Sequence, residues 1–180
     1  PMNGPSLHDR NSLLAAGVEQ LQAGQLDVAE ARFRDALAIN SDDADALHLL
    51  GLVRHQSGHP EDAIGYIQKV VDQEPSNVGF MNNLGLMRRA AGQAAKALEC
   101  FRKIAGITPD EPEIHISLGN ALKDLGETED AIAAYRQALA LKTDYPEAYF
   151  NLAAAQHSAG NLEDALEYYD RALALNPDFA

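Results

Sequence analysis

Apolar positions along the chain recur at helical spacing and are interrupted by glycine. Within residues 112–145, apolar side chains stand at i, i+4, i+7 and i+8 from Ile114 to Leu122, the spacing of one face of an α-helix. Gly126 interrupts this pattern, which resumes from Ala131 to Leu139. The pattern predicts a helix, a turn and a second helix.

The same arrangement repeats along the chain with a period of 34 residues. Five glycines and five alanines keep this interval: Gly24, Gly58, Gly92, Gly126 and Gly160, and Ala29, Ala63, Ala97, Ala131 and Ala165. A fixed period of this length indicates stacked units, each of which buries its apolar face only against its neighbours. We therefore expect five helix pairs, at residues 10–43, 44–77, 78–111, 112–145 and 146–179.

The repeat resembles the tetratricopeptide repeat (TPR) family through Leu84-Gly85, Ala97, Phe101 and Pro109. Two positions depart from the family motif. Its Trp position reads Leu13, Leu47, Met81, His115 and Tyr149, and its Tyr position reads Gln20, Arg54, Arg88, Leu122 and Gln156. The resemblance implies an all-α solenoid, a right-handed superhelix of antiparallel helix pairs, with a concave groove lined by the first helix of each pair.

The residues at the two ends of the chain lead to two further predictions. Residues 1–9, which contain Pro, Gly, Asn and Ser, are interpreted as a flexible N-terminal lead or a remnant of cloning. The last repeat keeps apolar residues in its second helix, such as Leu166 and Leu173, where a terminal repeat needs a polar outer face. We therefore expect either a fragment of a longer array or protein, or self-association through this uncapped repeat.

Charge and composition exclude several classes of partner. With 14 Lys and Arg against 27 Asp and Glu, the net charge is −13, which repels nucleic acids and anionic membranes. Apolar runs stay short of the roughly 18 residues that a membrane span needs, and the N-terminus has no signal-peptide pattern. A single cysteine, Cys100, fits a reducing compartment. We expect a cytoplasmic protein that binds neither nucleic acid nor membranes.

One register of the expected groove is basic or titratable. Counted from the start of each unit, position 12 reads Leu21, His55, Arg89, Lys123 and His157. In an acidic chain, such a column predicts a ligand with anionic groups, for example a peptide carboxylate. The alternative is that these cations only offset the dipole at the end of the first helix, where each contributes about 0.3–1 kcal/mol. Both explanations stay open.

Other groove positions are amide-bearing or apolar. Asn82, Asn83, Asn120 and Asn151 offer paired donors and acceptors for an extended peptide backbone, and similar asparagine ladders line the TPR arrays of O-linked N-acetylglucosamine transferases. Alternatively, these amides cap helices or bridge neighbouring units. The groove register at position 5 includes His48, Ile116 and Phe150, of which the two apolar residues serve either a bound peptide or the core between repeats.

Catalytic and metal sites are not expected. His55 and His59 are four residues apart, but Gly58 ends the helix between them, so they need not share a face. Phosphate loops, nucleophile elbows and zinc-protease motifs do not occur in the sequence. We expect no enzyme activity in this segment, no metal and no cofactor.

The sequence therefore predicts a protein-protein interaction module that binds a peptide segment of a partner protein and scaffolds an assembly. An alternative follows from the sequences of the repeat units, which are similar to those of bacterial TPR arrays that precede glycosyltransferase or sulfotransferase domains. On that interpretation, the segment recruits protein substrates to a larger enzyme. Self-association of the scaffold is a further alternative.

Overall fold

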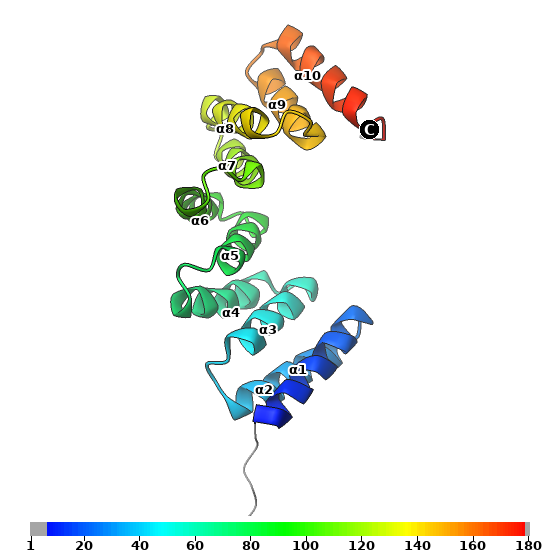
Figure 1. Ribbon diagram of the computed structural model, residues 1–180, viewed down its shortest axis with the longest axis vertical. Helices are drawn as coiled ribbons and strands as arrows, with labels where there is room; N and C mark the ends of the chain where they lie inside the picture. Colours follow the sequence, from blue (N-terminus) through cyan, green and yellow to red (C-terminus); the bar gives the residue numbers. More distant parts are fainter. Residues whose placement is uncertain (1–6, 179–180) are drawn as a thin grey trace, which may run out of the picture. The chain divides into compact units, whose positions relative to one another are not determined.

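The computed structural model describes residues 7–178, and this part of the chain consists of helices joined by short turns (Figure 1). The all-α prediction is confirmed. The ten helices are α1 (Leu7–Gln22), α2 (Leu26–Ile39), α3 (Ala44–Gln56), α4 (Pro60–Gln73), α5 (Val78–Ala90), α6 (Ala94–Ile107), α7 (Pro112–Asp124), α8 (Thr128–Leu141), α9 (Pro146–Ser158) and α10 (Leu162–Leu175).

The turns within the repeats follow the glycine column. Gly126 has a φ of 79°, a left-handed conformation that glycine adopts without strain, and the other four glycines of the column share it. The small residue in each first helix serves close packing. A Cβ on Gly119 would lie 2.4 Å from Cε1 of Tyr135, so only glycine lets α7 lie this close to α8. The helix pair of the fourth repeat therefore depends on glycine both at its turn and at its closest packing contact.

One boundary differs from the sequence expectation. Helix α1 begins at Leu7, so residues 7–9 are helical and not part of a flexible lead. Arg10 anchors this first turn, since its guanidinium binds the Asp43 carboxylate through two hydrogen bonds of 2.6 and 2.7 Å. Residues 1–6 and 179–180 lie outside the described residues.

The chain divides into two compact units, which we call unit 1 (residues 1–91) and unit 2 (residues 92–180). Their boundary lies between the two helices of the third repeat, so α5 belongs to unit 1 and α6 to unit 2. In unit 1, α1 packs on α2, α2 on α3, α3 on α4 and α4 on α5. In unit 2, the same succession runs from α6 to α10.

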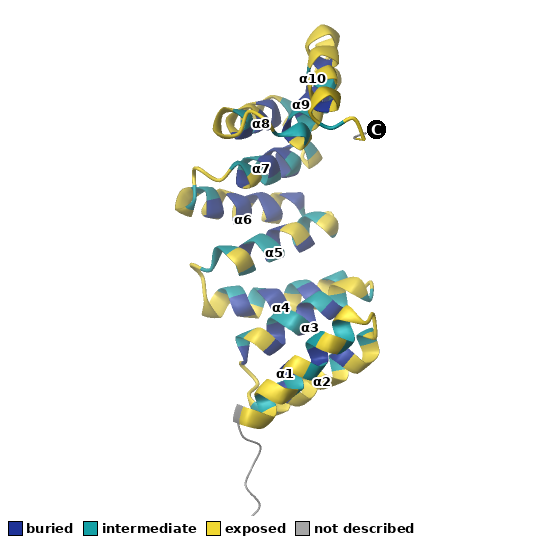
Figure 2. Ribbon diagram, turned by 45° about the vertical axis from the view of Figure 1, so that its right-hand side comes forward, coloured by how far each residue is buried: buried dark blue, intermediate teal, exposed yellow. Residues whose placement is uncertain are grey.

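Four of the five repeats bury a large residue fully at the aromatic register, and Tyr169 at this register of the fifth repeat is half-buried. Phe33 and Ile67 are fully buried in unit 1, and Phe101 and Tyr135 are fully buried in unit 2. Each such side chain contributes about 1.5–3 kcal/mol through burial. The buried faces lie between the helices of each unit, and the exposed faces point outward (Figure 2). Among the described residues, no helix is both long and apolar enough to cross a membrane.

Candidate peptide-binding surface

The predicted basic column lies at the ends of the first helices. His55 is in the last turn of α3 and Arg89 in that of α5, both in unit 1. Lys123 and His157 occupy the last turns of α7 and α9, both in unit 2. His55 and His157 are exposed, and Arg89 and Lys123 are half-buried. All four predicted residues therefore lie at the helix end to which a dipole attracts a cation.

The second helices of the repeats differ from the first helices in the charge of their last turns. Within the described residues, the last turns of α2, α4, α6, α8 and α10 contain no basic side chain. Their dipoles are as strong as those of the first helices, because the helix pairs are of similar length. Dipole compensation alone therefore does not explain why the cations occur on one set of helices.

His48 belongs to a cluster that joins the second and third repeats. Its Nε2 lies 2.9 Å from Nδ2 of Asn83, and its ring lies against Phe80 with centroids 5.0 Å apart. Burial lowers the pKa of His48 below its ordinary value of 6.5, although the nearby Asp45 carboxylate acts in the opposite direction. A neutral His48 accepts the hydrogen bond that the Asn83 amide donates. Asn83 therefore bridges neighbouring repeats, as the alternative interpretation of the asparagines predicts.

The other predicted asparagines have separate roles. Asn120 accepts a 2.8 Å hydrogen bond from the hydroxyl of Tyr135, which is fully buried in the helix pair of the fourth repeat. Its carbonyl oxygen therefore serves the packing of α7 against α8. Asn82 and Asn151 are half-buried on α5 and α9. The structure thus assigns two of the four asparagines to internal contacts.

The two apolar predictions have different outcomes. Ile116 is only 4% exposed, so it packs inside unit 2, as the core alternative predicts, and does not contribute an accessible groove surface. Phe150 is 40% exposed on α9, and its ring meets that of Tyr169 edge-on at 5.5 Å. One of the two apolar residues therefore remains accessible to a ligand.

Sequence reasoning missed two arginines that tie the first helices α3 and α5 to the preceding repeat. Arg54 of α3 reaches Glu30 of α2 at 3.3 Å and Asp62 of α4 at 2.6 Å. One period later, Arg88 of α5 donates a hydrogen bond to the side chain of Gln68 on α4. Both arginines occupy position 11. Their interval of 34 residues was the signal that could have identified them.

Asp43 is a second residue that the sequence interpretation overlooked. Its carboxylate caps α3 by accepting from the backbone N–H of Ala46, and it also binds Arg10. The Arg10 guanidinium holds the pKa of this carboxyl below its usual range. An aspartate directly before a helix start is an N-cap signal. The ion pair, by contrast, joins residues 33 positions apart and has no local signature.

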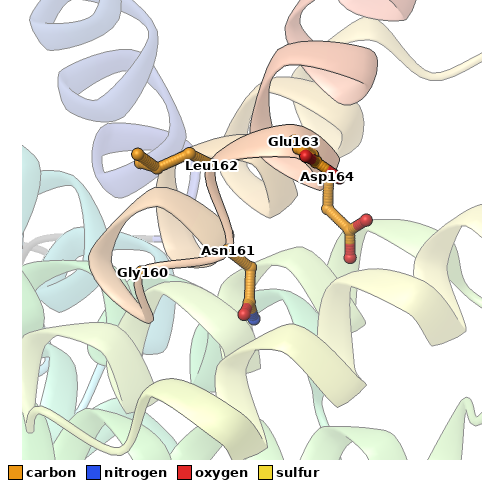
Figure 3. A pocket seen from close by; sticks show the side chains of 5 residues that line it. All are labelled: Gly160, Asn161, Leu162, Glu163 and Asp164. Atoms are coloured by element: carbon orange, nitrogen blue, oxygen red, sulfur yellow. The ribbon is translucent and has the colours of Figure 1, made fainter.

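The described residues contain no group of three or more His, Cys, Asp or Glu arranged to hold a metal. One surface pocket lies where α10 begins and is lined by Gly160, Asn161, Leu162, Glu163 and Asp164 (Figure 3). Gln156, only 2% exposed, holds this turn together, because it accepts from Asn161 at 2.8 Å and donates to Asp164 at 3.4 Å. The pocket is a structural turn and not part of the predicted surface.

Comparison with protein families gives one consistent result. Tetratricopeptide repeat profiles match residues 14–73, 54–112 and 146–179, and a related TPR repeat profile matches residues 119–160. Among curated proteins, Cellulose synthase operon protein C of Komagataeibacter xylinus is 40% identical over 78 residues. Cellulose synthase 1 operon protein C of the same organism is 43% identical over 60 residues. These matches cover 43% and 33% of this chain but only 6% and 4% of the relatives.

Solved structures share the fold at low sequence identity. The MamA 41-end structure from Desulfovibrio magneticus RS-1 has a TM-score of 0.88 at 16% identity, with 99% of each chain covered. A second structure, titled Crystal structure of MamA protein, has a TM-score of 0.83 at 21% identity and covers 94% of this chain and 92% of its own. At such identities the likeness establishes the arrangement of helices alone.

Proposed function

Because the chain belongs to the tetratricopeptide repeat family, whose members are protein-interaction scaffolds, we propose that its first helices bind an acidic peptide segment of a partner protein. The observation that carries this proposal is the uneven distribution of basic and titratable side chains. His55, Arg89, Lys123 and His157 mark the last turns of four first helices, whereas the described second helices carry no cation there.

Charge supports the same proposal. The chain has a net charge of −13, so a ligand with carboxylate groups experiences general repulsion and needs a local basic surface. In unit 1, the column offers Arg89 and His55, and in unit 2 it offers Lys123 and His157. Phe150 adds an accessible aromatic ring on α9, which suits an apolar side chain of the peptide.

The test compares two charge-reversed variants of the complete chain. Binding of fluorescein-labelled acidic, neutral and basic peptides of equal length is measured by fluorescence anisotropy. We expect Arg89→Glu with Lys123→Glu to weaken binding of the acidic peptides about tenfold or more, since each reversal converts attraction into repulsion. Arg102→Glu with Arg136→Glu is the matched control, because both arginines are exposed on second helices and the net charge changes equally.

Two results contradict the proposal. Equal weakening by both double variants would show that only net charge matters. Unchanged binding in the Arg89 and Lys123 variant would leave helix-dipole compensation as the role of the column. Higher salt should weaken binding to the wild-type chain, because exposed charges are screened beyond about 10 Å at 0.1 M.

A second candidate function rests on the curated relatives. We propose as an alternative that the array is one interaction segment of a larger protein and recruits proteins for polysaccharide synthesis, because the relatives are cellulose synthase operon proteins and the chain covers 4–6% of them. The broader form of this alternative is a substrate-recruiting segment of a glycosyltransferase or sulfotransferase. Proximity labelling in the native host tests it: enrichment of polysaccharide-synthesising enzymes is expected, and a labelled set without them would reject it.

A further inference from the structure

His48 and Asn83 join α3 to α5 in unit 1 by a hydrogen bond whose direction follows from its two atoms. Nε2 of the imidazole and Nδ2 of the amide lie 2.9 Å apart. An amide nitrogen donates hydrogen bonds and does not accept them, so the ring nitrogen is the acceptor. The proton of the neutral imidazole is therefore on Nδ1.

The pair leaves two polar atoms for other partners. Within the described part of the chain, Nδ1 of His48 and Oδ1 of Asn83 make no hydrogen bond. Both residues are half-buried, and neither atom belongs to the buried side-chain atoms without a partner, so both atoms reach solvent. The pair thus offers a ligand one donor and one acceptor. A peptide group, with its own C=O and N–H, complements this combination.

Protonation of His48 reverses the arrangement. Both ring nitrogens of an imidazolium are donors, so Nε2 then meets the amide nitrogen with a hydrogen of its own. A half-turn of the Asn83 amide about χ2 restores the hydrogen bond, because it exchanges nitrogen for an oxygen of nearly the same size. The rotated amide presents its two N–H groups to solvent. Beside the charged imidazolium, these donors suit a carboxylate, which only accepts.

Few charged groups act on the His48 ring. On α3 itself, the Asp45 carboxylate favours the protonated form, and this carboxylate also binds Arg10 of α1 at 2.7 Å. From α5, Phe80 packs against the ring and Asn83 bonds to it, and neither of these side chains titrates. The groups on α1, α3 and α5 therefore include a single acid that attracts the imidazolium.

The other two helices packed on α3 bring charges that are already paired. Glu30 of α2 and Asp62 of α4 bind Arg54, at 3.3 and 2.6 Å. Burial has the larger effect and lowers the pKa of His48 below its ordinary value of 6.5. His48 is therefore neutral at pH 7.5 and gains its second proton as the pH falls below 6.5.

The pair lies on the same face of α3 as the basic column. His55 follows His48 by seven residues, or two helical turns, so the two side chains share a face about 10 Å apart along the axis. On α5, the helix that carries Asn83, Arg89 occupies the register of His55. A peptide that follows the column in unit 1 therefore passes close to the pair.

We propose that His48 is a positioning residue for ligand selection in unit 1. When neutral, it turns the oxygen of the Asn83 amide outward to a peptide group, and when protonated, it turns the amide nitrogen outward to a carboxylate. Unit 1 therefore holds an acidic segment more tightly at low pH. The inference rests on the proposed function, because it concerns the same surface and the same class of ligand.

Solution NMR of the nitrogen-15-labelled complete chain tests the pair without a ligand. Two-bond proton–nitrogen correlations identify the ring nitrogen of His48 that carries the proton, and the side-chain signals of Asn83 report on its amide. We expect a proton on Nδ1 at pH 7.5 and loss of the hydrogen-bonded Asn83 amide proton as the pH falls to about 5. His48→Gln keeps an acceptor but does not titrate, so its Asn83 signals should stay constant. A proton on Nε2 at pH 7.5, or constant Asn83 signals in the wild-type chain, overturns the inference.

Binding is measured by fluorescence anisotropy with rhodamine-labelled acidic and neutral peptides of equal length. From pH 7.5 to 5.5, the wild-type chain should gain about fivefold more affinity for the acidic peptide than the His48→Gln variant gains. His59→Gln is the matched control, because it removes an exposed imidazole of unit 1 that makes no side-chain cap on α4. This control should keep the pH dependence of the wild-type chain, and circular dichroism checks that both variants remain folded.

The inference and the proposed function fail in different ways. Equal pH dependence in the wild-type chain and the His48→Gln variant overturns the inference. If that binding still requires Arg89 and Lys123, the proposed function is retained and the inference alone is rejected. Failure of the acidic peptide to bind at either pH rejects both.

Discussion

Unit 1 and unit 2 use one repeat, but the first junction between repeats in each unit has different chemistry. Between the first and second repeats, Glu30 of α2 pairs with Arg54 of α3. At the same registers of the third and fourth repeats, unit 2 has Leu98 on α6 and Leu122 on α7, both buried. The packing between neighbouring repeats therefore accepts either an ion pair or apolar side chains at this register. The two arrangements differ in their contribution to folding stability, because a partly exposed ion pair contributes little and buried apolar side chains contribute more.

The largest expected effect comes from removing one side chain at this register in each unit. Leu98→Ala should lower the free energy of unfolding by about 2–5 kcal/mol, because it leaves a cavity in a buried contact. Glu30→Ala, its equivalent in unit 1, should cost about 1 kcal/mol or less, since the carboxylate remains partly hydrated. Urea unfolding followed by circular dichroism measures both. Equal losses would show that the two contacts are energetically equivalent.

A smaller effect is expected at the helix start that precedes α3 in unit 1. Asp43→Ala should cost about 1–2 kcal/mol, because it removes the cap of α3 and the partner of Arg10. In unit 2, Glu111 occupies the same register before α7 but makes no side-chain cap. Glu111→Ala should therefore change stability by less than about 0.5 kcal/mol. A similar loss in both variants would remove capping as the explanation.

The internal polar contact of unit 2 gives a third prediction. Tyr135→Phe keeps the buried ring but removes the hydroxyl that donates to Asn120. We expect a loss of about 0.5–1.5 kcal/mol, the usual net contribution of one hydrogen bond. Phe33 and Phe101 occupy the same register without a hydroxyl, so the fold itself should be unaffected. Thermal unfolding provides the measurement, and an unchanged midpoint would mean that water replaces the hydroxyl without cost.

The smallest effect is a pH dependence at His48 in unit 1. Burial lowers the pKa of His48 in the folded chain, while the unfolded chain keeps the ordinary value of 6.5. Below 6.5, the unfolded chain therefore binds more protons, and the free energy of unfolding falls as the pH decreases. Above 6.5, both states are neutral and the contribution is constant.

The corresponding measurement is urea unfolding from pH 7.5 down to about 5, a range that keeps the carboxylates charged. His48→Leu should show a weaker decline than the wild-type chain, since the other histidines contribute equally to both. Identical declines would mean that His48 is as easily protonated in the folded chain as in the unfolded one.

Much of the fold was predictable because each repeat has local causes. Pro112 and Pro146 suit the first turn of a helix, and α7 and α9 begin at these residues. Gly126 and its equivalents set the turns through a conformation that other residues avoid. The start of α1 was predicted less well, because the contact that anchors it is made by Arg10 with the distant Asp43.

The candidate surface was only partly predictable. The spacing of His55, Arg89, Lys123 and His157 places them at equivalent helix ends without any knowledge of neighbours. Asn83 and Asn120 have partners on other helices, His48 and Tyr135, which the sequence does not reveal. Ile116 stands at the groove register, position 5, with the core between repeats as the alternative, and only the structure shows that its own surroundings bury it.

By itself, the sequence determined the period of 34 residues, the helix pairs and the column of cations, because these depend on backbone preference and helical spacing. The tertiary structure decided which side chains are shared between repeats and which stay accessible. Burial and hydrogen bonding depend on residues far apart in the chain, as between Arg54 and Glu30. Ile132, for example, is buried because α9 packs against α8, a contact between helices that the sequence alone does not reveal.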